Sequence, residues 1–139
     1  MTPFTDIYPF ALTVISDYRL ETLAQSNYTA FLLKMKEILI KSIPRFTGCM
    51  QSLDFDTTTD SFVNTLTLQE QEILGEYMEL TWFESVINDI RQVNLRVQVR
   101  GAKTNSEASN LKEKVKAYNA LKEQVGNRVS DYQLLSMGG

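Results

Sequence analysis

The sequence predicts a single, mainly α-helical domain, a small bundle of three or four helices with a minor two-stranded β element. Apolar residues recur at helical spacing over long stretches, whereas the alternation typical of a strand is confined to short segments near 51–56 and 93–100. The 139 residues, 43% of them hydrophobic and 22% charged, suit one globular domain with a substantial core. We expect this domain to cover 1–139, with a short frayed tail over 133–139.

The N-terminal third predicts one irregular helix and one regular helix. Apolar residues are dense over 4–25 but are interrupted by Pro9, which favours a short irregular helix beginning near Asp6. Asn27 is a suitable N-cap for the next helix, whose apolar residues keep helical spacing until Pro44. This predicts a helix over about 28–42.

A polar loop with a short strand near 51–56 leads into a long helix. The acids Asp54, Asp56 and Asp60 in this loop lack the glycine and the glutamate of a calcium loop, so we interpret them as solvated. Thr67 and Glu70 then form a Thr-x-x-Glu capping box, which marks the start of a helix. The apolar stripe that follows predicts a helix over about 68–92 and is wide enough to bury two neighbouring surfaces.

The period changes after this helix. Val93, Leu95, Val97 and Val99 alternate with polar residues, which predicts a strand over 93–100 that ends at Gly101. Ser106 can cap a last helix over about 106–132, whose apolar stripe again has helical spacing. Trp82, within the long helix, is interpreted as a core residue.

The composition argues against catalysis. The chain has no histidine, one cysteine (Cys49) and no glycine-rich phosphate loop, which removes imidazole-based catalysis, intramolecular disulfides and the common nucleotide-binding motifs. Glu76, Tyr77 and Glu79 are the only local group suited to acid–base chemistry. We therefore predict a protein that is not an enzyme and that needs no cofactor or metal.

Charge is segregated along the chain. Residues 47–90 contain nine acids and no base, whereas residues 91–128 contain nine bases and three acids. One interpretation is an antiparallel hairpin within one molecule, with Lys112, Lys116 and Lys122 near the glutamates. The other is head-to-tail contact between copies that close into a ring. For that ring, the expected interface residues are Glu72, Glu76, Glu79, Arg96, Arg100, Lys112 and Lys116.

Several short phrases between about 17 and 132 resemble small neck proteins of tailed bacteriophages, the head-to-tail connectors or adaptors. These phrases are Asp17-Tyr18-Arg19-Leu20, Ile43-Pro44-Arg45-Phe46, Leu68-x-Glu70-Gln71-Glu72-Ile73-Leu74, Trp82-Phe83 and Ser106-x-x-x-Asn110-Leu111-Lys112. The resemblance implies a non-enzymatic virion protein, assembled in the host cytoplasm, that forms a homo-oligomeric ring at the portal vertex. Its partners would be the portal and other neck or tail proteins, with non-specific contact to passing DNA.

An alternative function stays open at this point. The same helices could form a small cytosolic, monomeric binding module, a regulator or an assembly chaperone that recognises one client through an amphipathic groove. The net charge of -3 argues against a dedicated nucleic-acid-binding protein, and we expect no membrane span.

Overall fold

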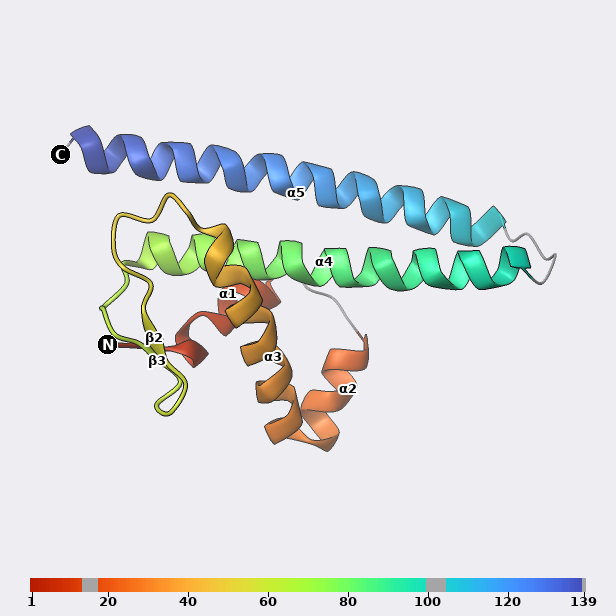
Figure 1. The fold of residues 1–139 in the computed structure, drawn as a ribbon, viewed down its shortest axis with the longest axis horizontal. Coiled ribbons are helices and arrows are strands. Elements are labelled where there is room, and N and C mark those ends of the chain that lie inside the picture. Colours follow the sequence, from red (N-terminus) through yellow and green to blue (C-terminus); the bar gives the residue numbers. More distant parts are fainter. Residues whose placement is uncertain (14–17, 100–104, 139) are drawn as a thin grey trace.

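The computed structural model describes residues 1–13, 18–99 and 105–138 and is mainly helical, as predicted. Two long helices, α4 (Leu68–Val99) and α5 (Asn105–Gly138), lie side by side and antiparallel (Figure 1). The shorter helices α1 (Tyr8–Leu12), α2 (Tyr18–Ser26) and α3 (Tyr28–Ser42) lie on the side of α4 away from α5. The α4–α5 hairpin is thus the axis on which the rest of the chain is assembled.

A small antiparallel sheet closes one end of the molecule. It consists of β1 (Thr2–Pro3), β2 (Phe55–Asp56) and β3 (Ser61–Phe62), in the order β1-β3-β2. The predicted strand near 51–56 is therefore confirmed over its last two residues, but it pairs with β3, which in turn pairs with β1. Asp60 takes a positive φ of 51° in the turn between β2 and β3.

The predicted strand over 93–100 is wrong, because residues 93–99 continue α4 and residue 100 lies outside the described part of the chain. A helix that is already formed gains one hydrogen bond for each residue added, whereas a lone strand needs a partner strand to satisfy its backbone. The helix therefore extends seven residues beyond the expected end at 92.

The other helices follow their sequence signals closely. The Asn27 side chain caps α3 by accepting a hydrogen bond from the Ala30 amide (3.1 Å), and α3 is followed by a 3-10 turn, η2 (Ile43–Arg45), that contains Pro44. The irregular N-terminal helix is divided into the 3-10 turn η1 (Phe4–Asp6), α1 and α2. Residues 133–138, expected as a tail, continue α5.

The core lies where α1, α3 and the sheet meet α4, and it extends under α5. Its largest fully buried apolar side chains are Phe4, Ile7, Met35, Leu39, Phe62, Ile73, Leu74, Met78 and Val125. At Gly75, α1 approaches α4 so closely that a Cβ atom there would lie 2.5 Å from the Phe10 Cβ. Trp82 is buried, with 8% of its surface exposed, as predicted. None of the described helices is long and apolar enough to cross a membrane.

Candidate functional site

The first turn of α4 is fixed by the predicted capping box. The Thr67 amide donates to Glu70 Oε1 (2.8 Å), and the Glu70 amide donates to Thr67 Oγ1 (3.2 Å). The buried Glu70 carboxylate also accepts hydrogen bonds from Tyr132 Oη (2.6 Å), Gln51 Nε2 (2.6 Å) and Cys49 Sγ (3.4 Å). Burial acts to raise the pKa of Glu70, but these hydrogen bonds, Tyr132 first, bring the pKa below its usual value. The carboxylate therefore stays ionised and ties α4 to α5.

One arginine of α5 binds two of the predicted interface glutamates. Arg128 Nε lies 2.7 Å from Glu76 Oε1, and Arg128 Nη1 forms an ion pair with Glu72. Burial raises the pKa of Glu76, and the neighbouring Glu72 adds to this effect, whereas the charge of Arg128 opposes it. Glu72 and Glu76 therefore contact their own chain.

Glu79, the third predicted glutamate, is almost completely buried, with 1% of its surface exposed. Within the described part of the chain, neither its Oε2 atom nor that of Glu76 has a hydrogen-bond partner. Burial, and after it the charge of Glu76, raise the pKa of Glu79 to about 8, against the opposing charge of Arg128. The Glu79 carboxyl is mainly protonated at pH 7 and is not available as an acidic contact for a neighbouring molecule.

Further along the hairpin, Glu84 joins three elements. It forms an ion pair with Arg45 of η2 and accepts a hydrogen bond from Tyr118 Oη of α5 (2.7 Å). The antiparallel hairpin is therefore confirmed, but the predicted pairing of its glutamates with lysines is wrong, since their partners are Arg45, Tyr118 and Arg128. Lys112, Lys116 and Lys122 are exposed and form no ion pair with any described residue.

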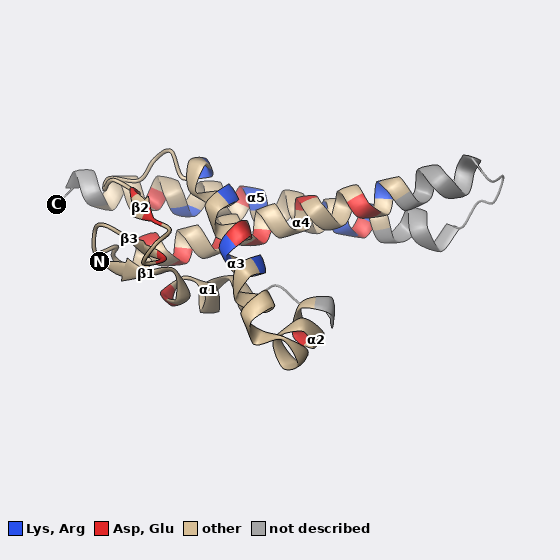
Figure 2. Ribbon diagram, turned by 60° about the horizontal axis from the view of Figure 1, so that its bottom comes forward, with Lys and Arg blue, Asp and Glu red and all other residues tan. Residues whose placement is uncertain are grey.

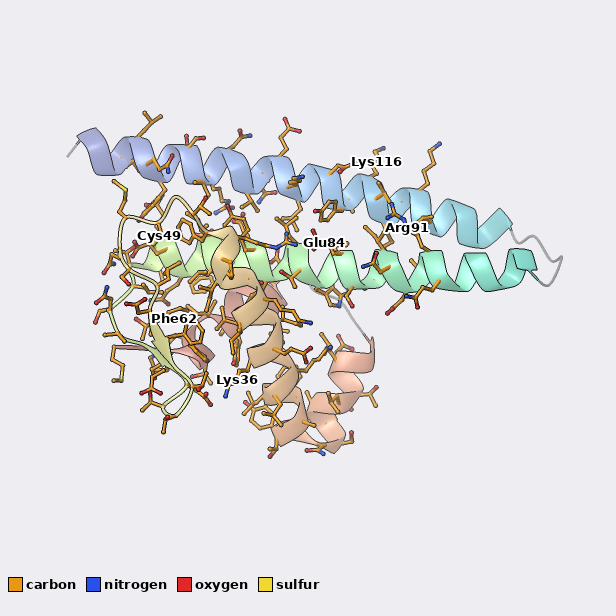
Figure 3. The ribbon with its side chains drawn as sticks, in the orientation of Figure 1. Lys36, Cys49, Phe62, Glu84, Arg91 and Lys116 are labelled. Atoms are coloured by element: carbon orange, nitrogen blue, oxygen red, sulfur yellow. The ribbon has the colours of Figure 1, made fainter. Side chains whose placement is uncertain are left out.

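The far part of the hairpin, residues 91–99 of α4 and 105–116 of α5, is here called the arm. In Figure 1 it extends beyond α1, α2 and α3. The sequence from 91 to 116 contains seven bases and two acids. Two of the predicted interface residues cannot be placed: the Arg96 side chain and residue 100 lie outside the described part of the chain. Figure 3 marks Arg91 on α4 and Lys116 on the adjoining part of α5.

The opposite end of the molecule exposes acids. Asp54 precedes β2, Asp56 lies in β2, and Asp131 lies near the C-terminal end of α5, and all three are exposed. Figure 2 shows the acidic colour at β2, and both basic and acidic residues along α5. Among the described residues, no base forms an ion pair with these three aspartates, and no acid forms one with Arg91, Lys112 or Lys116. The sequence alone left Asp54 and Asp56 as solvated loop acids and did not single out Asp131, because it did not show that the three lie opposite the arm.

The described residues contain no group of three His, Cys, Asp or Glu side chains placed to hold an ion. The remaining acid–base candidate, Tyr77, lies beside Phe46 at a ring-centroid distance of 5.9 Å, and burial raises its pKa. The site that the geometry offers is therefore a pair of oppositely charged surfaces at the two ends of the hairpin.

Comparison with known proteins adds no relative: the chain matches no protein-family model, and no curated protein or solved structure is significantly similar to it.

Proposed function

We propose that this chain is a non-enzymatic structural subunit that assembles head to tail with copies of itself into a ring. The observation that carries the proposal is the separation of unpaired charge, with Arg91, Lys112 and Lys116 on the arm and Asp54, Asp56 and Asp131 at the opposite end. Such a contact joins two different surfaces, so it repeats from copy to copy and closes into a ring when the rotation between copies permits.

The two charged surfaces are too far apart to neutralise each other within one molecule. Lys116 and Asp131 are both on α5, and 15 residues of helix span roughly 22 Å at a rise of 1.5 Å per residue. Exposed charges attract each other weakly beyond about 8 Å at physiological ionic strength. A second copy can bring the arm and the acidic end together, which one chain cannot do for itself.

The resemblance to phage neck proteins supports a particular place for this ring. We propose that it is an adaptor at the head–tail junction of a virion, assembled in the host cytoplasm, with the portal and other neck or tail proteins as its partners. Two of the phrases that carry the resemblance contain residues that join separate elements of the fold, since Arg45 binds Glu84 and Glu70 binds Tyr132. Non-specific contact with passing DNA fits the bases of the arm.

The experiment is to measure the mass of the purified protein by light scattering over a range of concentrations, at low and at high salt. Head-to-tail charge pairing predicts oligomers of defined size at low salt that dissociate as the salt concentration rises. A monomer at every concentration and salt would refute self-assembly. Fixed one-to-one binding to a single client would then identify the alternative, a monomeric helical binding module or assembly chaperone.

The DNA contact has its own test. Retention of the protein on immobilised duplex DNA should be measurable at low salt and should fall steeply as salt increases. The reason is that the bases of the arm would bind DNA through its phosphates, and salt weakens such contacts. The matched variant is Arg91→Glu with Lys116→Glu, which should remove retention without altering the circular dichroism spectrum. The absence of retention at low salt would refute this part of the proposal.

A further inference from the structure

Large apolar side chains are exposed at the end of the molecule that carries the sheet and the base of the hairpin. Between 56% and 70% of the surface of each is exposed, which leaves most of their apolar area in water. We call this set the apolar end, and its members are Met1, Met50, Val63, Leu68, Leu134 and Leu135.

Hydrogen bonds hold the segments of the apolar end in place. The Met1 ammonium donates to Thr65 Oγ1 (2.9 Å), which joins the N-terminus to the segment that carries Val63 and Leu68. The Met50 amide donates to Tyr132 Oη (2.9 Å), on the turn of α5 before Leu134 and Leu135. Tyr132 in turn donates to Glu70, in the first turn of α4. Four separate segments are therefore fixed at one end, and a fixed cluster of exposed apolar groups is typical of an interaction site.

The charges beside the apolar end indicate the kind of partner that fits it. Asp131 is about one turn from Leu134 and Leu135 on α5. The Asp54 carbonyl accepts a hydrogen bond from the Val63 amide (2.9 Å). Both aspartates are exposed and form no ion pair with the described residues. The complementary partner is a surface that combines apolar residues with bases.

The arm has this composition. The α4 part of the arm, residues 91–99, contains four apolar residues, two arginines and no acid in its sequence, and the facing part of α5 adds the exposed Lys112 and Lys116. In the described part of the chain, α4 has only α5 beside it along the arm (Figure 1). Arg91 is exposed on α4, and the Val115 side chain on α5 is half-buried, so both helices contribute to this surface.

We propose that the apolar end of one copy binds the arm of the next copy, with Asp54 and Asp131 facing the bases of that arm. This inference rests on the proposed head-to-tail assembly and names the two surfaces that form the contact. It implies that apolar burial provides much of the binding energy and that the charges select the orientation. High salt should then weaken the assembly without removing the apolar contribution.

The apolar contribution is tested with the double variant Leu68→Ser/Leu135→Ser, whose two side chains are 69% and 70% exposed. The matched control is Leu33→Ser, because Leu33 is 60% exposed but lies on α3, away from the apolar end. Self-association is measured by sedimentation equilibrium, and folding is measured by thermal melting. We expect the double variant to raise the dissociation constant at least tenfold with an unchanged melting temperature, while the control assembles as the wild type does.

Charge reversal tests whether the surface that binds the apolar end is the arm of another copy. One variant carries Arg91→Glu and Lys116→Glu on the arm, and a second carries Asp54→Lys and Asp131→Lys at the opposite end. Each variant alone presents like charges at the contact and should remain monomeric at low salt. Their mixture should assemble, because the arm of each variant is then complementary to the opposite end of the other.

The outcomes separate this inference from the proposed function. If the wild type assembles but the leucine variant assembles equally well, or the two reversed variants fail to assemble when mixed, the contact named here is wrong while head-to-tail assembly stands. A wild type that is monomeric under all conditions refutes both. Assembly of either reversed variant by itself would also contradict the contact.

Discussion

The buried carboxyl of Glu79 makes the stability of this domain depend on pH in a way that can be calculated. Its pKa in the folded chain is raised from the usual 4.5 to about 8. A carboxyl whose pKa is raised by folding holds its proton more tightly in the native state than in the unfolded state. Its contribution to stability is therefore fully present below pH 4.5 and is lost as the pH rises through 8.

The size of the effect follows from this difference in pKa. Each pH unit between the two pKa values changes the free energy of unfolding by about 1.4 kcal/mol, so the interval from 4.5 to 8 corresponds to roughly 5 kcal/mol. Between pH 5 and pH 9 the wild type should lose about 4 kcal/mol of this contribution. The replacement Glu79→Gln keeps the shape of the protonated side chain and removes the titration.

The measurement is urea unfolding of the wild type and the Glu79→Gln variant at intervals from pH 5 to pH 9. We expect similar stabilities at pH 5 and a variant that is more stable by several kcal/mol at pH 9. Subtracting the two curves removes the titration of other groups, such as Glu70, whose lowered pKa acts in the opposite direction. Glu123→Gln, at an exposed position of α5, is the matched control and should follow the wild type. A difference between wild type and variant that stays constant with pH would refute the reasoning.

Other predictions concern packing around α4. Arg128→Met removes the cation beside Glu72 and Glu76 and should lower the free energy of unfolding by about 1–3 kcal/mol, measured in urea, with a larger loss at pH 9 than at pH 6. Gly75→Ala places a methyl group 2.5 Å from the Phe10 Cβ and should lower the free energy of unfolding by about 1–3 kcal/mol. Gly126→Ala, with open space around it, should raise the free energy of unfolding by about 0.5–1 kcal/mol. Thermal melting distinguishes the two variants, and equal effects would contradict the close approach of α1 to α4. Trp82→Ala should cost roughly 3–5 kcal/mol in urea unfolding, and a loss of assembly without this loss of stability would contradict its place in the core.

Local signals in the sequence predicted the helices well because the structure uses them directly. Asn27 caps α3, and the Thr67–Glu70 box opens α4, so both starting points were readable from side chains that bind nearby amides. The alternation over 93–99 was misleading. In a helix, residues two apart point to nearly opposite sides. An alternating pattern is therefore compatible with a helix whose apolar residues are distributed around its axis, as well as with a strand.

Contacts between distant segments were beyond the sequence. The spacing of Glu72, Glu76 and Glu79 showed that they share one side of a helix, but only the packed structure shows that Arg128 lies on it. Glu79 was expected at an exposed interface, although the wide apolar stripe of α4 left little of that helix for solvent. The apolar end could not be predicted, because each of its residues is unremarkable in its own segment, and a single exposed apolar residue is common.

The hydrogen bonds to Glu70 also have a consequence for how the molecule opens. Its donors Gln51, Cys49 and Tyr132 are 19, 21 and 62 residues away along the chain, and all converge on one buried carboxylate. If α5 alone separated from α4, the buried Glu70 carboxylate would lose the hydrogen bond from Tyr132. This loss costs free energy and therefore opposes local opening of α5. The first turn of α4, the loop around Cys49 and the turn of α5 that carries Tyr132 should therefore exchange their amide hydrogens as one cooperative unit, with a common free energy of opening.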